Sequence, residues 1–169
     1  MDYGLVYYGS SVLRETAKPI EEIDDSLLSL AESMFKIMYK NNGVGLAAPQ
    51  AGVSSRLIVV HTQEHGSKPM AIINPEIIAS DDNMVPYEEG CLSVPGVNAE
   101  IERPSKVLLR GISPKGKELR IEADGLLARV FQHETDHLNG KLFIDYVEPY
   151  QRNEIKHILK KIKKLNKSS

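Results

Sequence analysis

The chain has 169 residues, of which 41% are hydrophobic and 26% charged, as in an ordinary globular protein. This length fits a single domain that buries roughly 70% of the surface exposed by the unfolded chain. The net charge of -2 excludes a general attraction to nucleic acid, and the single cysteine, Cys91, excludes an intramolecular disulfide. Because the sequence shows neither a signal-peptide pattern nor a long apolar run, we expect a cytoplasmic protein without a membrane segment.

The first predicted element is an amphipathic helix. From Asp24 to Tyr39 the apolar residues recur at helical spacing, and Asp24 is a suitable cap. Asn41 and the glycine after Asn42 end the pattern. The segment Gly43 to Gln50 contains two glycines and a proline, so we expect an ordered loop there.

Short runs that are rich in β-branched and aromatic residues follow, and they predict strands. These runs are Leu57 to Val60, Met70 to Ile73, Ile77 to Ala79, Val85 to Glu89, Lys106 to Ile112 and Leu119 to Ala123. Gly, Pro, Asn and Asp separate them, which favours a mainly antiparallel arrangement.

Two more helices are predicted in the last third of the chain. Asp124 can cap a helix from Gly125 to Leu138, and a second helix from Gln151 to about Asn166 has an apolar stripe opposite a lysine-rich face. The sequence contains no linker or repeat. We therefore expect an α+β fold in one domain, residues 1–169, with the strands arranged around the helix from Gly125 to Leu138.

This central helix carries the motif His133-Glu134-Thr135-Asp136-His137. Histidines four residues apart project from one helix face, so one metal ion can bind both. Glu134 is then placed to take a proton from water activated by the metal. The alternative is a chance match in a core helix, but the motif favours a metal-dependent hydrolase.

A catalytic metal commonly has three protein ligands, and two histidines supply only two. The residues after His137 offer Asp145, Glu148 and Glu154, none at a spacing typical of a motif. Cys91 is the other candidate. A lone cysteine is more often a small buried side chain, but Gly90, the Pro95-Gly96 turn and the missing ligand favour Cys91 as the third ligand.

Three segments of the chain resemble the ordered motifs of peptide deformylases. They are Gly-Val-Gly-Leu-Ala-Ala-Pro-Gln (Gly43 to Gln50), Glu-Gly-Cys-Leu-Ser (Glu89 to Ser93) and Gln-His-Glu-Thr-Asp-His (Gln132 to His137). The resemblance also extends over nearly the whole chain. It implies removal of the formyl group from the N-terminal formyl-methionine of nascent polypeptides, with release of formate.

The resemblance also implies roles for individual residues. The implied metal ligands are Cys91, His133 and His137, with Glu134 as the proton carrier. The implied oxyanion donors are the side-chain amide of Gln50 and the backbone N–H of Leu92. The positions that match the methionine pocket are Val44, Tyr87, Leu126 and Val130, together with Glu89, although these apolar residues are equally typical of a core. Gly45 is expected to allow close approach by an extended peptide.

A thiolate and two imidazoles suit iron(II), zinc, nickel or cobalt, and the resemblance favours iron(II). Between the two histidines, Asp136 is costly to bury without a partner. We therefore expect an ion pair between Asp136 and Arg103 that holds the ligand helix; a solvated Asp136 is the alternative.

Two other functions remain open at this point. One is an endopeptidase of the H-E-x-x-H type, which leaves Cys91 and Gln50 without roles. The other is a non-catalytic module that a metal ion stabilises and that docks on ribosomes through its basic last helix. The lysine face of the last helix is most simply solvated, but it also suits a weak contact with the ribosome through phosphates.

Overall fold

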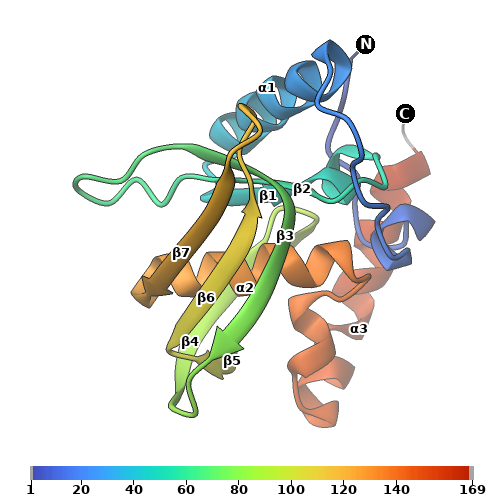
Figure 1. Ribbon diagram of the computed structural model, residues 1–169. Coiled ribbons are helices and arrows are strands. Elements are labelled where there is room, and N and C mark those ends of the chain that lie inside the picture. The colour runs from blue at the N-terminus through green and yellow to red at the C-terminus, as the bar shows by residue number, and fades with distance from the viewer. Residues whose placement is uncertain (1, 168–169) are drawn as a thin grey trace.

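Three α-helices and seven β-strands form within residues 2–167, which are the residues that the computed structural model describes (Figure 1). Residues 1, 168 and 169, which belong to the expected domain, lie outside the described residues. The helices are α1 (Asp25–Lys40), α2 (Gly125–Leu138) and α3 (Pro149–Lys163). The strands are β1 (Gly45–Ala47), β2 (Leu57–Val60), β3 (Met70–Ser80), β4 (Met84–Cys91), β5 (Val94–Pro104), β6 (Lys106–Ile112) and β7 (Glu118–Asp124).

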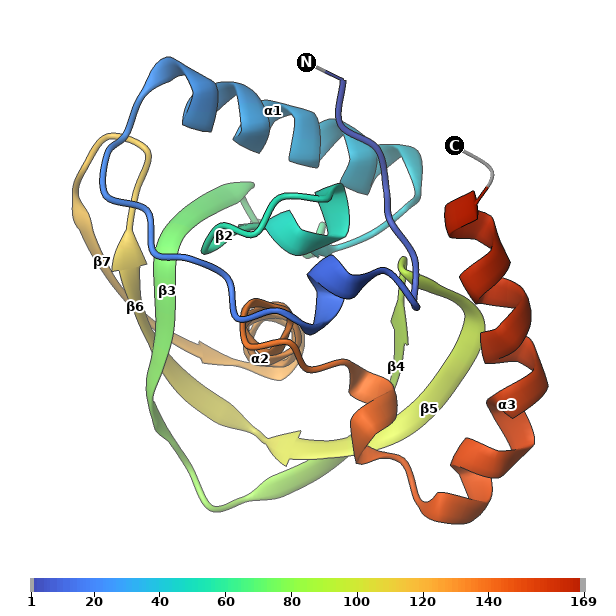
Figure 2. The ribbon, with the colours of Figure 1, turned by 90° about the vertical axis from the view of Figure 1, so that its right-hand side faces the viewer.

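The strands form two antiparallel units around α2. One sheet has the order β1-β2-β3-β6-β7, and β4 and β5 pair separately as a hairpin. Figure 2 shows α2 end-on in the centre, with the large sheet on one side and the hairpin on the other. The α+β fold with strands around a central helix is therefore confirmed.

Helix α1 covers β1 and β2. The carboxylate of Asp24 accepts a hydrogen bond of 2.9 Å from the backbone N–H of Leu27, which satisfies one of the free donors at the helix start. The apolar residues of α1 pack on one core cluster, and the buried ones are Leu27, Leu30, Ala31, Met34 and Met38. The helix predicted from Asp24 to Tyr39 is thus confirmed.

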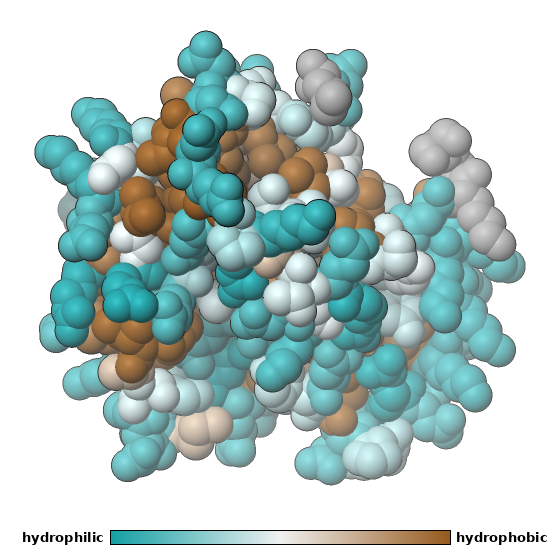
Figure 3. All heavy atoms as spheres, turned by 45° about the vertical axis from the view of Figure 1, so that its right-hand side comes forward, coloured by the Kyte–Doolittle hydropathy of each residue, from teal (hydrophilic) through white to brown (hydrophobic). Residues whose placement is uncertain are grey.

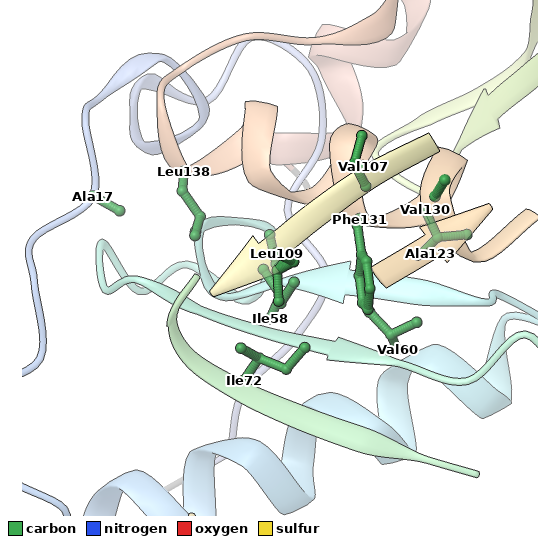
Figure 4. Packing of buried hydrophobic residues seen from close by; sticks show 12 residues of the cluster. Ala17, Ile58, Val60, Ile72, Val107, Leu109, Ala123, Val130, Phe131 and Leu138 are labelled. Atoms are coloured by element: carbon green, nitrogen blue, oxygen red, sulfur yellow. The ribbon is translucent and has the colours of Figure 1, made fainter. Parts of the chain in front are cut away.

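The main core lies between α2 and the large sheet. Phe131 reaches from α2 to the side chains of the sheet, next to Val60, and Ile58 and Leu109 lie beside it (Figure 4). All four are buried completely. Helix α2 ends at Leu138, and Gly140, two residues later, has a φ of 73°, a left-handed conformation that glycine adopts without strain. At its start, Asp124 occupies the cap position but makes no capping hydrogen bond with its side chain, contrary to the expectation.

Helix α3 packs against the hairpin. Leu159 and Ile162 are buried in a core cluster that includes Val94 and Ile101 of β5. The helix begins at Pro149, two residues before the expected start, since proline has a suitable φ for the first turn and needs no N–H partner there. It ends at Lys163 in place of Asn166, and a 3₁₀ turn, η4 (Lys164–Lys167), follows.

Two predictions about the first half of the chain were wrong in detail. The segment Gly43 to Gln50 is not a loop, because β1 pairs with β2 and a 3₁₀ helix, η2 (Ala48–Ala51), follows it. The predicted strands Met70 to Ile73 and Ile77 to Ala79 are one strand, β3. Register shifts in its pairing with β6 accommodate the proline between them.

Strand β5 was not predicted. It contains Pro95, Gly96 and several charged residues, which hide the alternating pattern of a strand. It nevertheless pairs with β4 along most of its length. Within residues 2–167 no helix has the length and apolar character needed to cross a membrane. On the face drawn in Figure 3, hydrophobic side chains form separate patches among hydrophilic ones.

Candidate metal centre

The two histidines of the motif lie one turn apart on α2. Their ring centroids are 5.1 Å apart, and the rings are inclined by 67°. His133 is 8% exposed and His137 is 1% exposed. The ring of Phe143 stacks on His133 with a centroid distance of 6.1 Å. The helix therefore presents two fixed imidazoles to the same region.

Cys91 reaches these histidines from the end of β4. A register shift between Gly90 and Cys91 leads into the tight turn to β5. The thiol sulfur lies 3.4 Å from Nε2 of His137, and one donor atom from each of Cys91, His133 and His137 lies within 4.8 Å of the others. In a tetrahedral zinc site, sulfur and nitrogen ligands lie about 3.5 Å apart. The spacing of the donors thus fits one metal ion.

The charges of the site also fit a cation. Burial lowers the pKa of His137 well below its usual value, so this imidazole is neutral, as a metal ligand must be. Burial also acts to lower the pKa of His133, but the charge of Glu134 and the neighbouring Cys91 and Glu89 outweigh it and raise the pKa well above its usual value. The anionic groups around this ring therefore favour positive charge there, which a metal cation bound to the ring would supply in place of a proton.

Glu89 holds the second nitrogen of His133. Its Oε1 accepts a hydrogen bond of 2.9 Å from Nδ1, which leaves Nε2 free to coordinate. Nε and Nη2 of Arg103 donate to the two carboxylate oxygens at 2.6 and 3.0 Å, and Arg129 donates at 2.8 Å. Burial alone would raise the pKa of Glu89, but the bonds from His133 and Arg103 lower it to about 2. Glu89 is therefore a buried anion in a fixed position.

The expected ion pair between Arg103 and Asp136 is present. Nη1 of Arg103 lies 2.9 Å from Oδ2 of Asp136, and the hydroxyl of Tyr146 donates to the same oxygen at 2.8 Å. The guanidinium lies over the Tyr146 ring, 4.9 Å from its centroid. Arg103 thus connects Glu89, beside one histidine, with Asp136, beside the other. This network ties α2 to β4 and β5.

Glu134 faces the same site from α2. It is 4% exposed, and its Oε1 has no hydrogen-bond partner among the described residues. Burial raises its pKa to about 7, where a carboxyl group can both accept and release a proton near neutral pH. A Cβ atom added to Gly45 of β1 would lie 2.7 Å from Oε2 of Glu134 and 2.7 Å from Val130. Position 45 thus requires glycine because α2 lies so close to β1 there.

Gln50 presents its amide to the sulfur of Cys91. Its Oε1 accepts a hydrogen bond of 2.9 Å from the backbone of Ala47, which fixes the orientation of the amide. Its Nε2 then lies 3.5 Å from the sulfur of Cys91 and 3.2 Å from the hydroxyl of Ser93. Ser93 is completely buried and donates to the carbonyl of Val6 at 2.8 Å. The amide is therefore a fixed donor beside the metal ligands.

These groups line a cavity of about 790 Å³. The sequence-predicted residues in its wall are Val44, Gly45, Gln50, Tyr87, Glu89, Cys91, Leu92, Leu126, Val130, His133 and Glu134. His137 is buried and does not line it. The predicted site residues thus come together from β1, η2, the β4–β5 hairpin and α2.

Sequence reasoning missed several polar residues that support the site. These residues are Ser93, Arg129 and Tyr146. The sequence also predicted Glu89 only as a residue of the substrate pocket. Arg129, which precedes the histidine motif in α2, could be recognised as a charged residue on a helix face rich in apolar residues. The partners of Arg129, however, are the carboxylate of Glu89 and the backbone carbonyls of Val85 in β4 and Ile101 in β5, which no local pattern reveals.

Known proteins share this architecture. The family model for polypeptide deformylase matches residues 3–153. The chain belongs to this family. Peptide deformylase 1 of Pseudomonas syringae pv. tomato is 46% identical over 162 residues, which cover 96% of each chain. The peptide deformylase of Halothermothrix orenii is 55% identical over 139 residues, covering 82% of this chain and 89% of that one.

Solved deformylase structures agree with the fold. The crystal structure of a peptide deformylase from Legionella pneumophila is 42% identical with a TM-score of 0.90, and the match covers 100% of this chain and 99% of that one. A deformylase from Synechococcus elongatus, solved in complex with actinonin, is 43% identical with a TM-score of 0.86 over 94% of this chain and 86% of that one. The deformylase described here is thus a metal-dependent hydrolase that removes the formyl group from the N-terminal formyl-methionine of nascent polypeptides.

Proposed function

We propose that this deformylase acts as one catalytic domain, residues 1–169, in which Cys91, His133 and His137 hold a single divalent metal ion. The observation that carries this proposal is the convergence of their three donor atoms within 4.8 Å, in a cavity that Glu134 also faces. A structural zinc site normally has four protein ligands. With only three protein ligands, one coordination position of the metal ion would stay open for the reaction.

Hydrolysis adds water to the formyl carbon, breaks the bond to nitrogen and transfers a proton to the leaving amine. A divalent ion held by Cys91, His133 and His137 would lower the pKa of a water molecule and so supply the nucleophile near neutral pH. Glu134 accepts the proton of this water and returns it to the amine nitrogen. The free Oε1 of Glu134 and its pKa of about 7 support this role.

Negative charge develops on the formyl oxygen during the reaction. We assign its stabilisation to the side-chain amide of Gln50 and the backbone N–H of Leu92. The hydrogen bond from Ala47 to Gln50 supports this assignment, because it turns the amide nitrogen toward Cys91. Loss of one such donor typically costs about 2.7 to 4 kcal/mol of transition-state stabilisation.

We also propose an apolar pocket for the methionine side chain in the same cavity. We assign its walls to Val44, Leu126 and Val130, with Tyr87 and Glu89 at its side and Gly45 next to the peptide backbone. Val130 is 4% exposed and so lies deep in the pocket, whereas Tyr87 is 51% exposed and lies at its mouth. The guanidinium of Arg129 lies over the Tyr87 ring, 5.4 Å from its centroid, and fixes the ring at this mouth.

We propose iron(II) as the native ion. The thiolate and two imidazoles also suit zinc, nickel and cobalt, and the family resemblance favours iron(II). Protein purified without oxygen is expected to contain iron and to lose activity on exposure to air. Zinc as the main metal, together with full activity after exposure to air, would contradict the assignment.

The activity is tested with two peptides. A formyl-methionyl tripeptide is expected to release formate, while an acetylated peptide that offers only internal amide bonds is expected to stay intact. Cleavage of the second peptide without formate release from the first would favour the endopeptidase alternative. Glu134→Gln is expected to abolish turnover while the protein keeps its metal, and Glu100→Gln, at an exposed position on β5, is a control.

We propose that the enzyme works in the cytoplasm, with weak contact to the ribosome. Exposed lysines of α3 and η4 support this contact, and they are Lys156, Lys160, Lys161, Lys163 and Lys164. Reversing the charge of Lys156 and Lys160 is expected to reduce pelleting with ribosomes, and added salt is expected to weaken pelleting of the unaltered protein. Unchanged pelleting of the double variant would contradict this contact.

A further inference from the structure

The side chain of Gln50 ends in a primary amide that can lie in two orientations. A half-turn of the amide exchanges its carbonyl oxygen and its NH2 group, which are nearly equal in size, so packing alone does not choose between them. Only the orientation that turns the NH2 group toward Cys91 can donate a hydrogen bond to an oxyanion beside the metal ligands. The hydrogen-bond partners of Gln50 therefore decide whether the amide can act as a donor in the reaction.

The backbone of Ala47 fixes one end of this amide. A backbone N–H can only donate, so the atom that it contacts at 2.9 Å must be the carbonyl oxygen Oε1 of Gln50. Gln50 is 1% exposed, so its polar atoms depend on partners within the protein. Both ends of the amide therefore need a protein partner of the correct type.

Ser93 supplies the partner at the other end. Its hydroxyl lies 2.8 Å from the backbone carbonyl of Val6, which can only accept, so that bond uses the single hydroxyl proton. Toward Gln50 the same oxygen, 3.2 Å from Nε2, can then act only as an acceptor. In the reversed amide, Oε1 would face this oxygen and the NH2 group would face the N–H of Ala47. The reversed orientation thus loses two hydrogen bonds and brings like groups together.

The contact with Ser93 also gives the amide its direction. A primary amide has two N–H bonds, and Ser93 accepts from one of them. The sulfur of Cys91 lies 3.5 Å from the same nitrogen. The second N–H is therefore left for the side of the metal ligands.

The main chain around Ser93 is held without its hydroxyl. The backbone N–H of Tyr8 donates to the carbonyl of Ser93, and that of Val6 donates to the carbonyl of Gln50, both at 2.8 Å. Strand β5 begins at the next residue, Val94. Removal of the hydroxyl thus breaks the chain of hydrogen bonds from Gln50 through Ser93 to Val6 and leaves the path of the backbone in place.

We propose that Ser93 is a positioning residue for deformylation. Its hydroxyl, oriented by the carbonyl of Val6, holds the Gln50 amide with the NH2 group toward the metal ligands. Ser93 is completely buried and does not line the active-site cavity, so it acts on the reaction through Gln50 and not by contact with the substrate. The proposal rests on the oxyanion role that was assigned to Gln50 under the proposed function.

The test measures kcat and KM for formate release from formyl-Met-Ser-Ser, and the metal content of the same samples. Ser93→Ala is expected to lower kcat about 10- to 100-fold, as a small misplacement of a catalytic group does, while KM and metal content stay unchanged. Gln50→Ala, which loses the donor itself, is expected to lower kcat about 100- to 1000-fold. Ser54→Ala is the control and is expected to leave kcat unchanged, because the buried Ser54 hydroxyl has no hydrogen-bond partner among the described residues.

A double variant separates positioning of Gln50 from a general structural role. If Ser93 acts through Gln50, adding Ser93→Ala to Gln50→Ala is expected to lower kcat by less than about twofold further. A serine that supported the fold, or the backbone N–H of Leu92, would lower kcat by its full factor in both backgrounds. That result would overturn the proposal.

A second pair of variants isolates the hydroxyl if the alanine variant fails to fold. Ser93→Thr and Ser93→Val introduce side chains of the same shape, so any packing strain is common to both, and only threonine keeps the hydroxyl. Urea unfolding compares their stability. The threonine variant is expected to have a kcat at least about fivefold above that of the valine variant, and equal kcat values would overturn the proposal.

The outcomes distinguish this proposal from the proposed function. No formate release by the unaltered enzyme would overturn the deformylase activity itself. Full kcat in Gln50→Ala would overturn the oxyanion role of Gln50, and the role of Ser93 with it. A slow Gln50→Ala beside a folded Ser93→Ala with full kcat would overturn the positioning role alone.

Discussion

Replacing Glu89 by alanine tests how the metal centre is supported. The Glu89 side chain is 3% exposed and binds Arg103, Arg129 and His133 at 2.6 to 3.0 Å. Its removal leaves two buried guanidinium groups without their shared anion, and breaking a buried pair in this way costs about 3–5 kcal/mol. With a urea dependence of the unfolding free energy of about 1–3 kcal/mol per molar, the unfolding midpoint is expected to fall by about 1–5 M.

The same substitution frees the ring of His133. Loss of a partner that orients a ligand histidine typically lowers metal affinity about 10- to 100-fold. Competition with a chelator measures this affinity, and urea unfolding of the metal-free protein measures stability separately. Glu89→Gln, which keeps the size and can still accept hydrogen bonds, is expected to lose less of both.

Glu100→Ala is the matched control, because Glu100 is an exposed residue of the neighbouring strand β5. It is expected to leave the unfolding midpoint and metal affinity unchanged. If Glu89→Ala and Glu100→Ala gave the same midpoint and the same affinity, the buried network would not be what stabilises the hairpin and orients His133.

Three other perturbations follow from the geometry. Gly45→Ala is expected to displace Glu134 and to lower kcat about 100-fold, since a small misplacement of a reacting group has this effect. Gly4→Ala is the control: an added Cβ there would meet no atom within 4 Å, so kcat is expected to stay unchanged. Burial acts to raise the pKa of Asp145, but its hydrogen bonds, chiefly from Arg14, lower it. Asp145→Asn should therefore cost up to about 1 kcal/mol at neutral pH, and the difference should disappear as pH falls below about 3.9, through the folded-state pKa. A chelator is expected to stop formate release and added metal to restore it; activity that persists after complete metal removal would contradict a metal centre.

The local signals of the sequence were sufficient for the helices and for most strands. Caps and periodicity are properties of neighbouring residues, so α1 and α2 were predicted close to their observed bounds. Strand β5 and the short β1 were missed because their pairing partners, not their own composition, make them strands. The bulged β3 was divided for the same reason, since only pairing with β6 shows that it continues past Pro75.

The sequence by itself determined the chemistry that the chain can perform: the H-E-x-x-H motif, the lone Cys91 and the three ordered motifs predict a deformylase with a metal ion. Only the tertiary structure decided how this chemistry is held. Glu89, Arg103 and Arg129 lie on three different elements, and Ser93 and Asn166 bind the N-terminal segment. The reason is physical. A ligand set is recognisable from residue types and spacing, whereas a buried polar group is satisfied by whichever distant atom the fold places beside it.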